Sequence, residues 1–119
     1  MGAPVIHFEI MGGSGVDLEA FYGTLFGWKI NSQNPMKYGL VDTGGGTGGI
    51  NGGIGTTQDG SQRVSVYVQV GDLQATLEQV ERLGGKTVLE PTAVPGGPQL
   101  AMFADPAGNI TGILLGQAS

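Results

Sequence analysis

Two residues near the start of the chain, His7 and Glu9, have side chains that could act as an acid–base pair. They lie in Val5–Met11, where apolar and other residues alternate as in a strand, so both point to one face while Ile6, Phe8 and Ile10 point to the other. Burial and a neighbouring charge can tune an imidazole or a carboxyl group toward neutral pH, as a general base requires. We therefore predict His7 and Glu9 as candidate catalytic residues. A polar pair with a purely structural role is the simpler alternative.

The same segment recurs later in the chain. His7-Phe8-Glu9-Ile10 aligns with Tyr67-Val68-Gln69-Val70 at an offset of 60 (67 − 7), and Asp17-Leu18 aligns with Asp72-Leu73 at an offset of 55 (72 − 17). The difference of five is assigned to an extra glycine-rich turn at residues 12–15. This alignment predicts that Tyr67 and Gln69 are the counterparts of His7 and Glu9.

Each copy of the repeat predicts one helix and four strands. The helix of the first copy begins near Asp17, carries an apolar stripe of Leu18, Phe21, Tyr22 and Leu25, and ends at Gly27. The helix of the second copy is capped by Asp72 and ends at Gly84-Gly85. The predicted strands are Val5–Met11, Trp28–Asn31, Met36–Thr43 and about 50–55 in the first copy, and Arg63–Val70, Lys86–Glu90, Gln99–Ala104 and Ile110–Leu115 in the second.

These elements predict an α+β fold of two tandem βαβββ modules in a single domain, 1–119. Module one covers about residues 4–55, a polar linker residues 56–62, and module two about residues 63–116. A chain of 119 residues can bury one compact core, and its 24 glycines lower the apolar fraction to 39% without implying disorder.

Charge and composition exclude several classes of partner. The net charge of −5 disfavours nucleic acid and anionic membrane surfaces, which require clustered Lys and Arg. The chain has no cysteine and no long apolar run, so we expect a soluble cytoplasmic protein. The spacing GxGxxG at Gly44, Gly46 and Gly49 is not taken as a dinucleotide site, because no helix pattern follows it.

Four segments together resemble a known superfamily. They are HFEI, FYGTLFGW, VGDLQATLEQVERLGGK and FADPAGNITGIL, which are spread over nearly the whole chain. The chain resembles the vicinal oxygen chelate superfamily, which includes glyoxalase I, extradiol dioxygenases, fosfomycin-resistance enzymes and bleomycin-resistance proteins. The resemblance implies that the two modules form one curved mixed sheet around a cleft, the glyoxalase/bleomycin-resistance/dioxygenase fold.

The resemblance also implies four metal-ligand positions, one on the first and one on the last strand of each module. Here they are occupied by His7, Gly53, Tyr67 and Gly112, so one good ligand remains of four. A stable divalent site needs three or four protein donors, and glycine offers no side chain. We therefore expect no metal and no cofactor, and a cleft made roomier by the two glycines.

The leading functional prediction is a metal-independent protein of the glyoxalase/bleomycin-resistance type that binds a small organic molecule in the cleft. His7, Glu9, Tyr67 and Gln69 would contact the ligand. Trp28, Tyr38 and Phe103 could line a hydrophobic part of the site, although a single aromatic residue on a strand is more often core.

Two other functions remain open. One is a lyase, isomerase, hydrolase or glyoxalase-like enzyme that uses His7 and Glu9 as acid and base. The other is a structural protein that dimerises without a ligand. We expect a homodimer in any case, because the first helix buries only one stripe.

Overall fold

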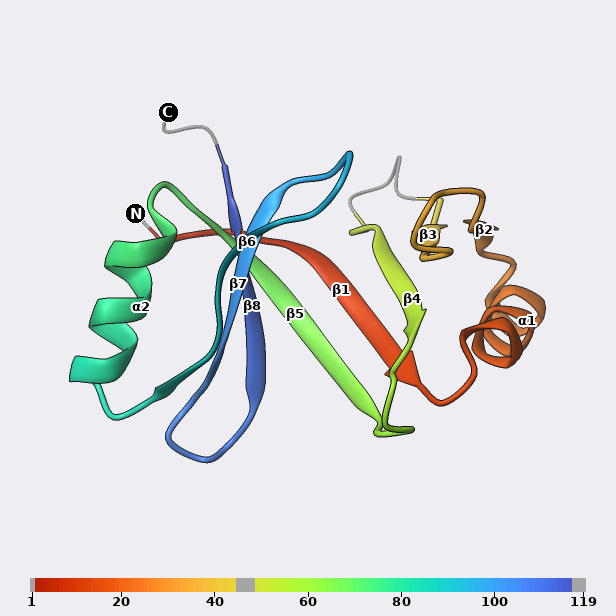
Figure 1. Cartoon of the computed structure of the whole chain (residues 1–119). Coiled ribbons are helices and arrows are strands. Elements are labelled where there is room, and N and C mark those ends of the chain that lie inside the picture. The colour runs from red at the N-terminus through yellow and green to blue at the C-terminus, as the bar shows by residue number, and fades with distance from the viewer. Residues whose placement is uncertain (1, 45–48, 117–119) are drawn as a thin grey trace. The chain divides into compact units, whose positions relative to one another are not determined.

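The computed structural model describes residues 2–44 and 49–116, which contain eight strands and two helices (Figure 1). Gly46 of the GxGxxG spacing lies outside the described residues. No helix in the described residues is long and apolar enough to cross a membrane. In chain order the elements are β1 (Val5–Gly12), α1 (Gly15–Phe26), β2 (Lys29–Asn31), β3 (Gly39–Asp42), β4 (Gly52–Thr56), β5 (Arg63–Val70), α2 (Leu73–Arg82), β6 (Lys86–Ala93), β7 (Gln99–Ala104) and β8 (Ile110–Leu115).

The chain forms two compact units. The amino-terminal unit comprises residues 7–65, and the carboxyl-terminal unit comprises residues 66–119 together with residues 1–6. The strand order is β2-β3-β4-β1 in the first and β6-β7-β8-β5 in the second. In both, the first strand of the repeat runs parallel to the fourth, and the other neighbouring strands are antiparallel. The predicted α+β class with two βαβββ modules is confirmed.

Side-chain caps set the start of both helices. The Ser14 hydroxyl accepts a hydrogen bond of 3.2 Å from the Asp17 backbone N–H, so α1 begins two residues earlier than predicted. Gly27, with φ at 70°, ends α1 as expected. Asp72 caps α2 by accepting a 2.9 Å bond from the Ala75 N–H, which confirms that prediction.

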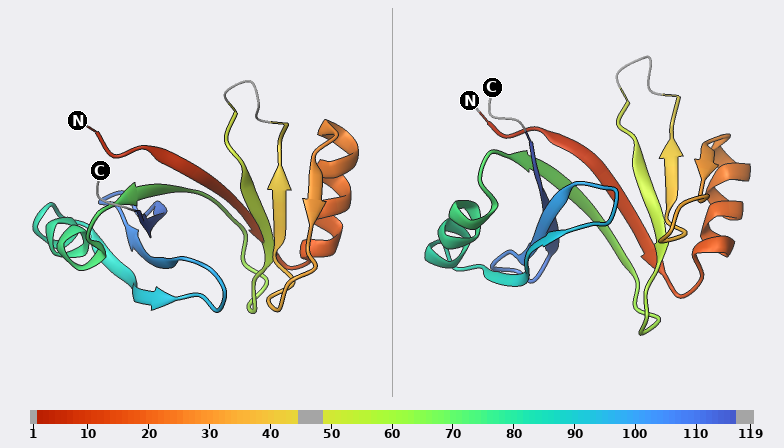
Figure 2. Two further views of the ribbon diagram at one scale, coloured as in Figure 1. Left: turned by 90° about the horizontal axis from the view of Figure 1, so that it is seen from above. Right: turned by 45° about the horizontal axis from the view of Figure 1, so that its top comes forward.

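The core of the amino-terminal unit lies between α1 and one face of the strands, and both views of Figure 2 show α1 along β2 to β4. Leu18 and Tyr22 are the α1 residues that pack on this core, whereas Phe21 and Leu25 are 59% and 58% exposed. The predicted four-residue stripe was therefore wrong in half of its members. The core consists of buried Ile10, Val41 and Ile54 with Phe8, Leu18, Tyr22, Trp28 and Ile30 packed against them.

The carboxyl-terminal unit has a separate core beneath α2. Leu73 and Leu77 of α2 are buried against Ala101 of β7 and Ile113 of β8. Val68, Val70 and Phe103 are half-buried hydrophobic residues packed on this cluster. Val68 and Val70 therefore face the helix, on the same side of β5, as residues two apart in a strand do.

The strand register corrects the internal alignment of the repeat. Glu9 pairs with Gly53 in the parallel β1–β4 ladder, and Tyr67 pairs with Gly112 in the parallel β5–β8 ladder. One offset of 58 relates the two modules. The first strands begin at Val5 and Arg63 (63 − 5), and the helices are capped by Ser14 and Asp72 (72 − 14). The predicted offsets of 60 and 55 were therefore wrong. Tyr67 corresponds to Glu9, and the counterpart of His7 is Ser65.

Candidate functional site

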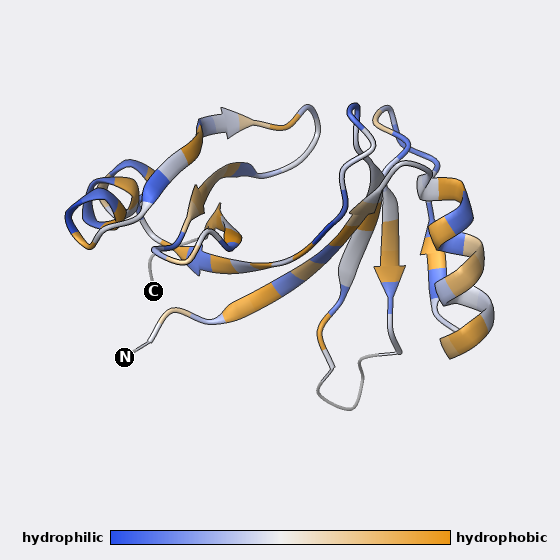
Figure 3. Ribbon diagram, turned by 90° about the horizontal axis from the view of Figure 1, so that it is seen from below, coloured by the Kyte–Doolittle hydropathy of each residue, from blue (hydrophilic) through white to orange (hydrophobic). Residues whose placement is uncertain are grey.

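His7 and Glu9 share the face of β1 that points away from α1. Their neighbours Phe8 and Ile10 pack in the helix-side core, so alternation directs His7 and Glu9 to the opposite face. Figure 3 shows the alternation along β1 as hydrophobic and hydrophilic bands. Glu9 is only 7% exposed and His7 is half-buried. A carboxylate buried this deeply requires polar partners.

Glu9 and His7 are joined through Tyr38, which precedes β3. The Tyr38 hydroxyl donates a 2.8 Å hydrogen bond to Glu9 Oε2 and lies 3.0 Å from His7 Nε2. The rings of His7 and Tyr38 are stacked at 21°, with centroids 6.3 Å apart. We name His7, Tyr38, Glu9 and Arg63 the His7 network.

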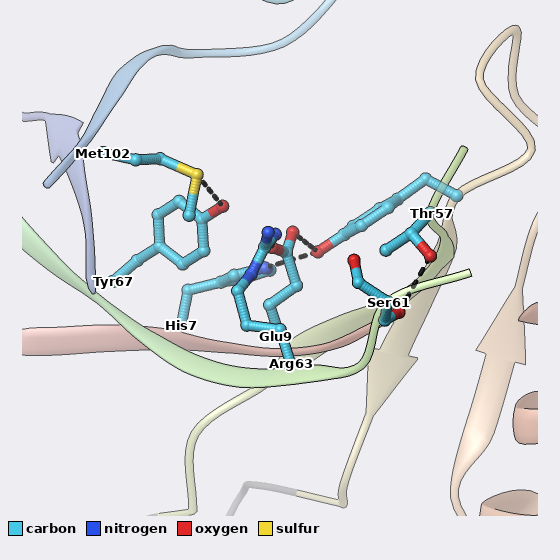
Figure 4. Close-up of polar contacts among 8 residues, drawn as sticks. His7, Glu9, Thr57, Ser61, Arg63, Tyr67 and Met102 are labelled. Carbon is cyan, nitrogen blue, oxygen red and sulfur yellow. Dashed lines mark hydrogen bonds and ion pairs between the residues drawn. The ribbon is translucent and has the colours of Figure 1, made fainter. Parts of the chain in front are cut away.

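Arg63, at the start of β5, completes the His7 network. Its NH2 group donates a 2.7 Å hydrogen bond to Glu9 Oε1 and forms an ion pair with this carboxylate (Figure 4). Sequence reasoning missed Arg63. Strand alternation could have identified it. Arg63 lies two and four residues before Ser65 and Tyr67, so all three point to the face of β5 opposite the valines that face α2.

A turn holds Tyr38 in place. The Lys37 backbone N–H donates a 3.0 Å bond to the Asn34 carbonyl, which closes a turn at residues 34–37. The Asn34 side chain also forms two hydrogen bonds with the backbone of Tyr38. Its Oδ1 accepts from the Tyr38 N–H at 2.9 Å, and its Nδ2 donates to the Tyr38 carbonyl at 2.6 Å. These two hydrogen bonds from Asn34 therefore fix the backbone from which the Tyr38 ring extends.

Tyrosine side chains occupy the space above the two glycines at the family's last-strand ligand positions. A Cβ atom at Gly53 would collide with the Tyr38 ring and hydroxyl, and one at Gly112 would collide with the Tyr67 ring. The expectation that these glycines make the site roomier was therefore wrong. Glycine is needed at both positions because an aromatic ring lies directly on the backbone.

Burial changes the protonation of His7. Desolvation lowers the pKa of His7 below its ordinary value of 6.5, and the weaker effect of the Glu9 carboxylate acts in the opposite direction. The lowered pKa favours the neutral form of the ring at pH 7. Glu9 instead has both carboxylate oxygens engaged, one by Arg63 and one by Tyr38, which suits an anchor rather than a base.

Two buried polar atoms beside the His7 network have no hydrogen-bond partner in the described residues: Arg63 Nε and Ser65 Oγ. Ser65 is only 4% exposed and, by alternation, shares the face of β5 that carries Arg63. Burying a hydroxyl without a partner costs about 1–3 kcal/mol, so Ser65 is a local weakness in the packing.

The other predicted ligand contacts divide between the two units. Tyr67 is buried in the carboxyl-terminal unit, where its hydroxyl contacts Met102 Sδ at 3.9 Å, and Gln69 is half-buried on the same face of β5. That they share a cleft with His7 and Glu9 stays a prediction. Trp28 and Phe103 pack in the helix-side cores, as a single aromatic residue on a strand usually does.

The residues at the family's ligand positions do not fit a divalent metal ion. Gly53 and Gly112 offer no donor, and tyrosine rings occupy the space where a longer side chain would extend. The register makes Glu9 the counterpart of Tyr67, but its oxygens are bonded to Arg63 and Tyr38. Within the described residues, no group of three or more His, Cys, Asp or Glu side chains could hold a metal.

Comparison with known families gives one match over most of the chain. The family described as glyoxalase-like domain matches residues 15–113. His7 and Glu9 precede the matched segment, so the match supports the fold without assigning a role to them. A comparison with curated proteins gave no match.

Solved structures support the same fold at low sequence identity. A hypothetical protein from Bacillus halodurans C-125 is 12% identical, with a TM-score of 0.72 over 100% of this chain and 98% of that one. A glyoxalase/bleomycin resistance protein/dioxygenase superfamily member from Vibrio splendidus 12B01 is 13% identical, with a TM-score of 0.64 over 97% and 100%. The Mn(II)-bound glyoxalase from Novosphingobium aromaticivorans is 17% identical, with a TM-score of 0.68 over 95% and 38%.

Proposed function

Because the chain belongs to the family of glyoxalase-like domains, we propose that it binds a small organic molecule without a metal ion, at the β1 face that presents His7 and Glu9. The His7 network is the observation that carries this proposal. It places a half-buried imidazole, a phenol and an ion pair together in one unit, with fixed hydrogen-bond directions. Small-molecule sites combine an apolar wall with a few such fixed polar groups.

Metal independence is supported by the chemistry of the donor set. Arg63 already neutralises the Glu9 carboxylate, and a cation would have to displace this guanidinium. The Tyr38 and Tyr67 rings cover the glycines where further carboxylates would stand. The His7 network therefore recognises its ligand through hydrogen bonds and ring contacts.

A second candidate function is acid–base catalysis by His7. The neutral imidazole supports it, since a base must be unprotonated at working pH. In this version Glu9 holds Tyr38 and Arg63 in place and does not itself take the proton. The reaction would be a proton transfer from the bound molecule to His7, as in a lyase or isomerase.

The proposal includes a homodimer and a cytoplasmic location. Phe21, Leu25 and Phe26 are each more than half exposed on α1, and a second copy that covered them would bury this apolar surface. The net charge of −5 disfavours nucleic acid and anionic lipid as partners.

The binding proposal can be tested on the chain's single histidine, whose imidazole signals in NMR spectra need no assignment by mutation. Protein treated with a chelator is titrated with a library of small polar organic compounds, with and without added Mn²⁺, Zn²⁺ or Ni²⁺. We expect some compounds to shift the His7 signals without metal. Binding only with a divalent ion would overturn metal independence. Compounds that bind wild type and His7→Gln equally would overturn the assignment of the site.

A further inference from the structure

Glu19 is a charged residue on the side of α1 that faces the strands. Residues four apart lie on the same side of a helix, and Glu19 is four residues after Gly15, which is buried. The Glu19 carboxylate lies over Gly39 of β3, where a Cβ atom would be only 2.9 Å from Glu19 Oε2. The absence of a side chain at Gly39 therefore leaves room for a carboxylate between the helix and the strand.

This carboxylate has no partner among the residues that the structure describes. Glu19 is half-buried, and it forms neither a hydrogen bond nor an ion pair with them. Carboxylates that are withdrawn from water are normally paired or hydrogen-bonded, because their desolvation is costly. Glu19 is therefore available to a donor or a cation that is not part of the chain.

The Glu19 side chain lines a cavity of about 460 Å³ in the amino-terminal unit. The walls are the start of α1, the connection between β2 and β3, and Thr56 of β4. Sites for small molecules begin at about 300 Å³, so this cavity can hold a small organic molecule. It lies on the α1 side of the strands, whereas His7 and Glu9 point to the opposite face. The cavity is therefore separate from the site proposed above.

Lys37 lines the same cavity and carries the opposite charge. Its φ of 50° lies in the left-handed region, which no other described residue except glycine adopts. Strained backbone of this kind occurs preferentially where a ligand is held. Lys37 is exposed, and within the described residues it forms no ion pair with Glu19 or any other carboxylate.

We propose that this cavity binds a small zwitterion, whose ammonium group donates to Glu19 and whose carboxylate accepts from Lys37. Free amino acids and ω-amino acids are the chemical class that fits. Glu19 and Lys37 line one cavity without pairing with each other, so a molecule that carries both charges satisfies both. Asn34 also lines the cavity, but both ends of its amide bond the backbone of Tyr38, so the two charged residues select the ligand.

The test is a titration of nitrogen-15-labelled protein with ω-amino acids from glycine to ε-aminocaproate, at millimolar concentrations and constant salt. The series varies the distance between the two charges. We expect the best-fitting member to shift the amide signals of Val16, Gln33 and Lys37. The matched acid and the matched amine, such as butyrate and butylamine for γ-aminobutyrate, should bind about tenfold more weakly or worse, because each loses one charge-assisted hydrogen bond.

Two variants assign the binding to the cavity. Glu19→Gln keeps the size of the side chain and removes its charge, and Lys37→Gly removes the ammonium group while glycine adopts the same φ freely. Each should weaken binding by about tenfold or more. Glu78→Gln on α2 and Lys29→Gln on β2 remove the same charges at exposed positions that do not line the cavity, so they should bind as wild type does.

Three results would overturn the proposal. The first is that no amino acid shifts the cavity signals, so that the cavity holds only water. The second is that the matched amine or acid binds as tightly as the amino acid. The third is that binding is unchanged in Glu19→Gln or in Lys37→Gly. Compounds that shift only the His7 signals would support the site at the His7 network and contradict this one, so the two proposals fail separately.

Discussion

The side chain of Tyr38 occupies the space that a Cβ atom at Gly53 would need. Gly53 pairs with Glu9 in the parallel β1–β4 ladder, so this contact lies next to the carboxylate that accepts the Tyr38 hydrogen bond. The absence of a side chain at Gly53 therefore leaves the space for the Tyr38 ring, whose hydroxyl contacts both His7 and Glu9.

Gly53→Ala should destabilise the protein, because the added methyl group collides with Tyr38. Overpacking of this kind costs about 1–3 kcal/mol. Urea unfolding should show the loss, and Tyr38→Ala combined with Gly53→Ala should cost less than the sum of the two single changes. Gly71→Ala is the matched control, because a Cβ there meets nothing within 4 Å. Equal stability of the Gly53 and Gly71 variants would contradict the close packing.

Arg63→Met should destabilise the protein because it leaves the Glu9 carboxylate buried without its cation. Breaking a buried pair costs about 3–5 kcal/mol, and we expect about 2 kcal/mol because the Arg63 side chain is 29% exposed. Arg82→Met, in the last turn of α2, removes the same charge from an exposed position. Chemical denaturation compares the two. A loss no greater than that of the Arg82 variant would show that the ion pair contributes nothing.

The free energy of unfolding should fall as the pH is lowered through about 6.5, because of His7. Burial lowers the folded-state pKa below 6.5, so the unfolded chain binds the proton first as pH falls. The loss starts near pH 6.5 and ends at the folded-state pKa. Asp59, Glu81 and Asp105, whose pKa values are also lowered, lose their contributions below their ordinary values of 3.8 to 4.5.

His7→Gln should flatten this part of the curve, since glutamine does not titrate. Urea midpoints measured at several pH values provide the test. A wild-type protein that gains stability on going from pH 7 to pH 5.5, relative to His7→Gln, would show that His7 binds its proton more tightly in the folded state.

Ser65→Ala should leave stability unchanged or raise the melting temperature. The wild-type hydroxyl is buried without a partner in the described residues, and its removal relieves a cost of about 1–3 kcal/mol. Thr57→Val is the contrast, because the Thr57 hydroxyl donates a 2.8 Å bond to the Ser61 carbonyl (Figure 4), and its loss should lower stability slightly. A clear loss in Ser65→Ala would indicate that an ordered water or ligand satisfies this hydroxyl.

Phe21→Asp should shift the protein toward monomer if α1 forms the proposed dimer interface. Phe21 is 59% exposed, so the change should have little effect on the fold itself. Light scattering at micromolar concentrations measures the mass, and Thr24→Asp on the same helix is the control. A wild-type mass of one chain would contradict the dimer. A stable dimer in Phe21→Asp would place the interface elsewhere.

The sequence alone determined the elements and the faces of the strands. Alternation in β1 predicted that Phe8 and Ile10 face the helix side, and the cap at Asp72 and the end of α1 at Gly27 were confirmed. These features are local, because a strand has period two and a cap is set within a few residues.

Only the tertiary structure decided the register and the contents of the site. A shift of two residues leaves every side chain on the same face, so hydropathy could not decide whether His7 or Glu9 is the counterpart of Tyr67 in the repeat. The ladders make Glu9 the counterpart, because Glu9 pairs with Gly53 and Tyr67 pairs with Gly112. Arg63 and Glu9 lie 54 positions apart in the sequence, and Tyr38 and Glu9 lie 29 positions apart. Contacts between distant segments depend on strand order and register, and no local pattern carries that information.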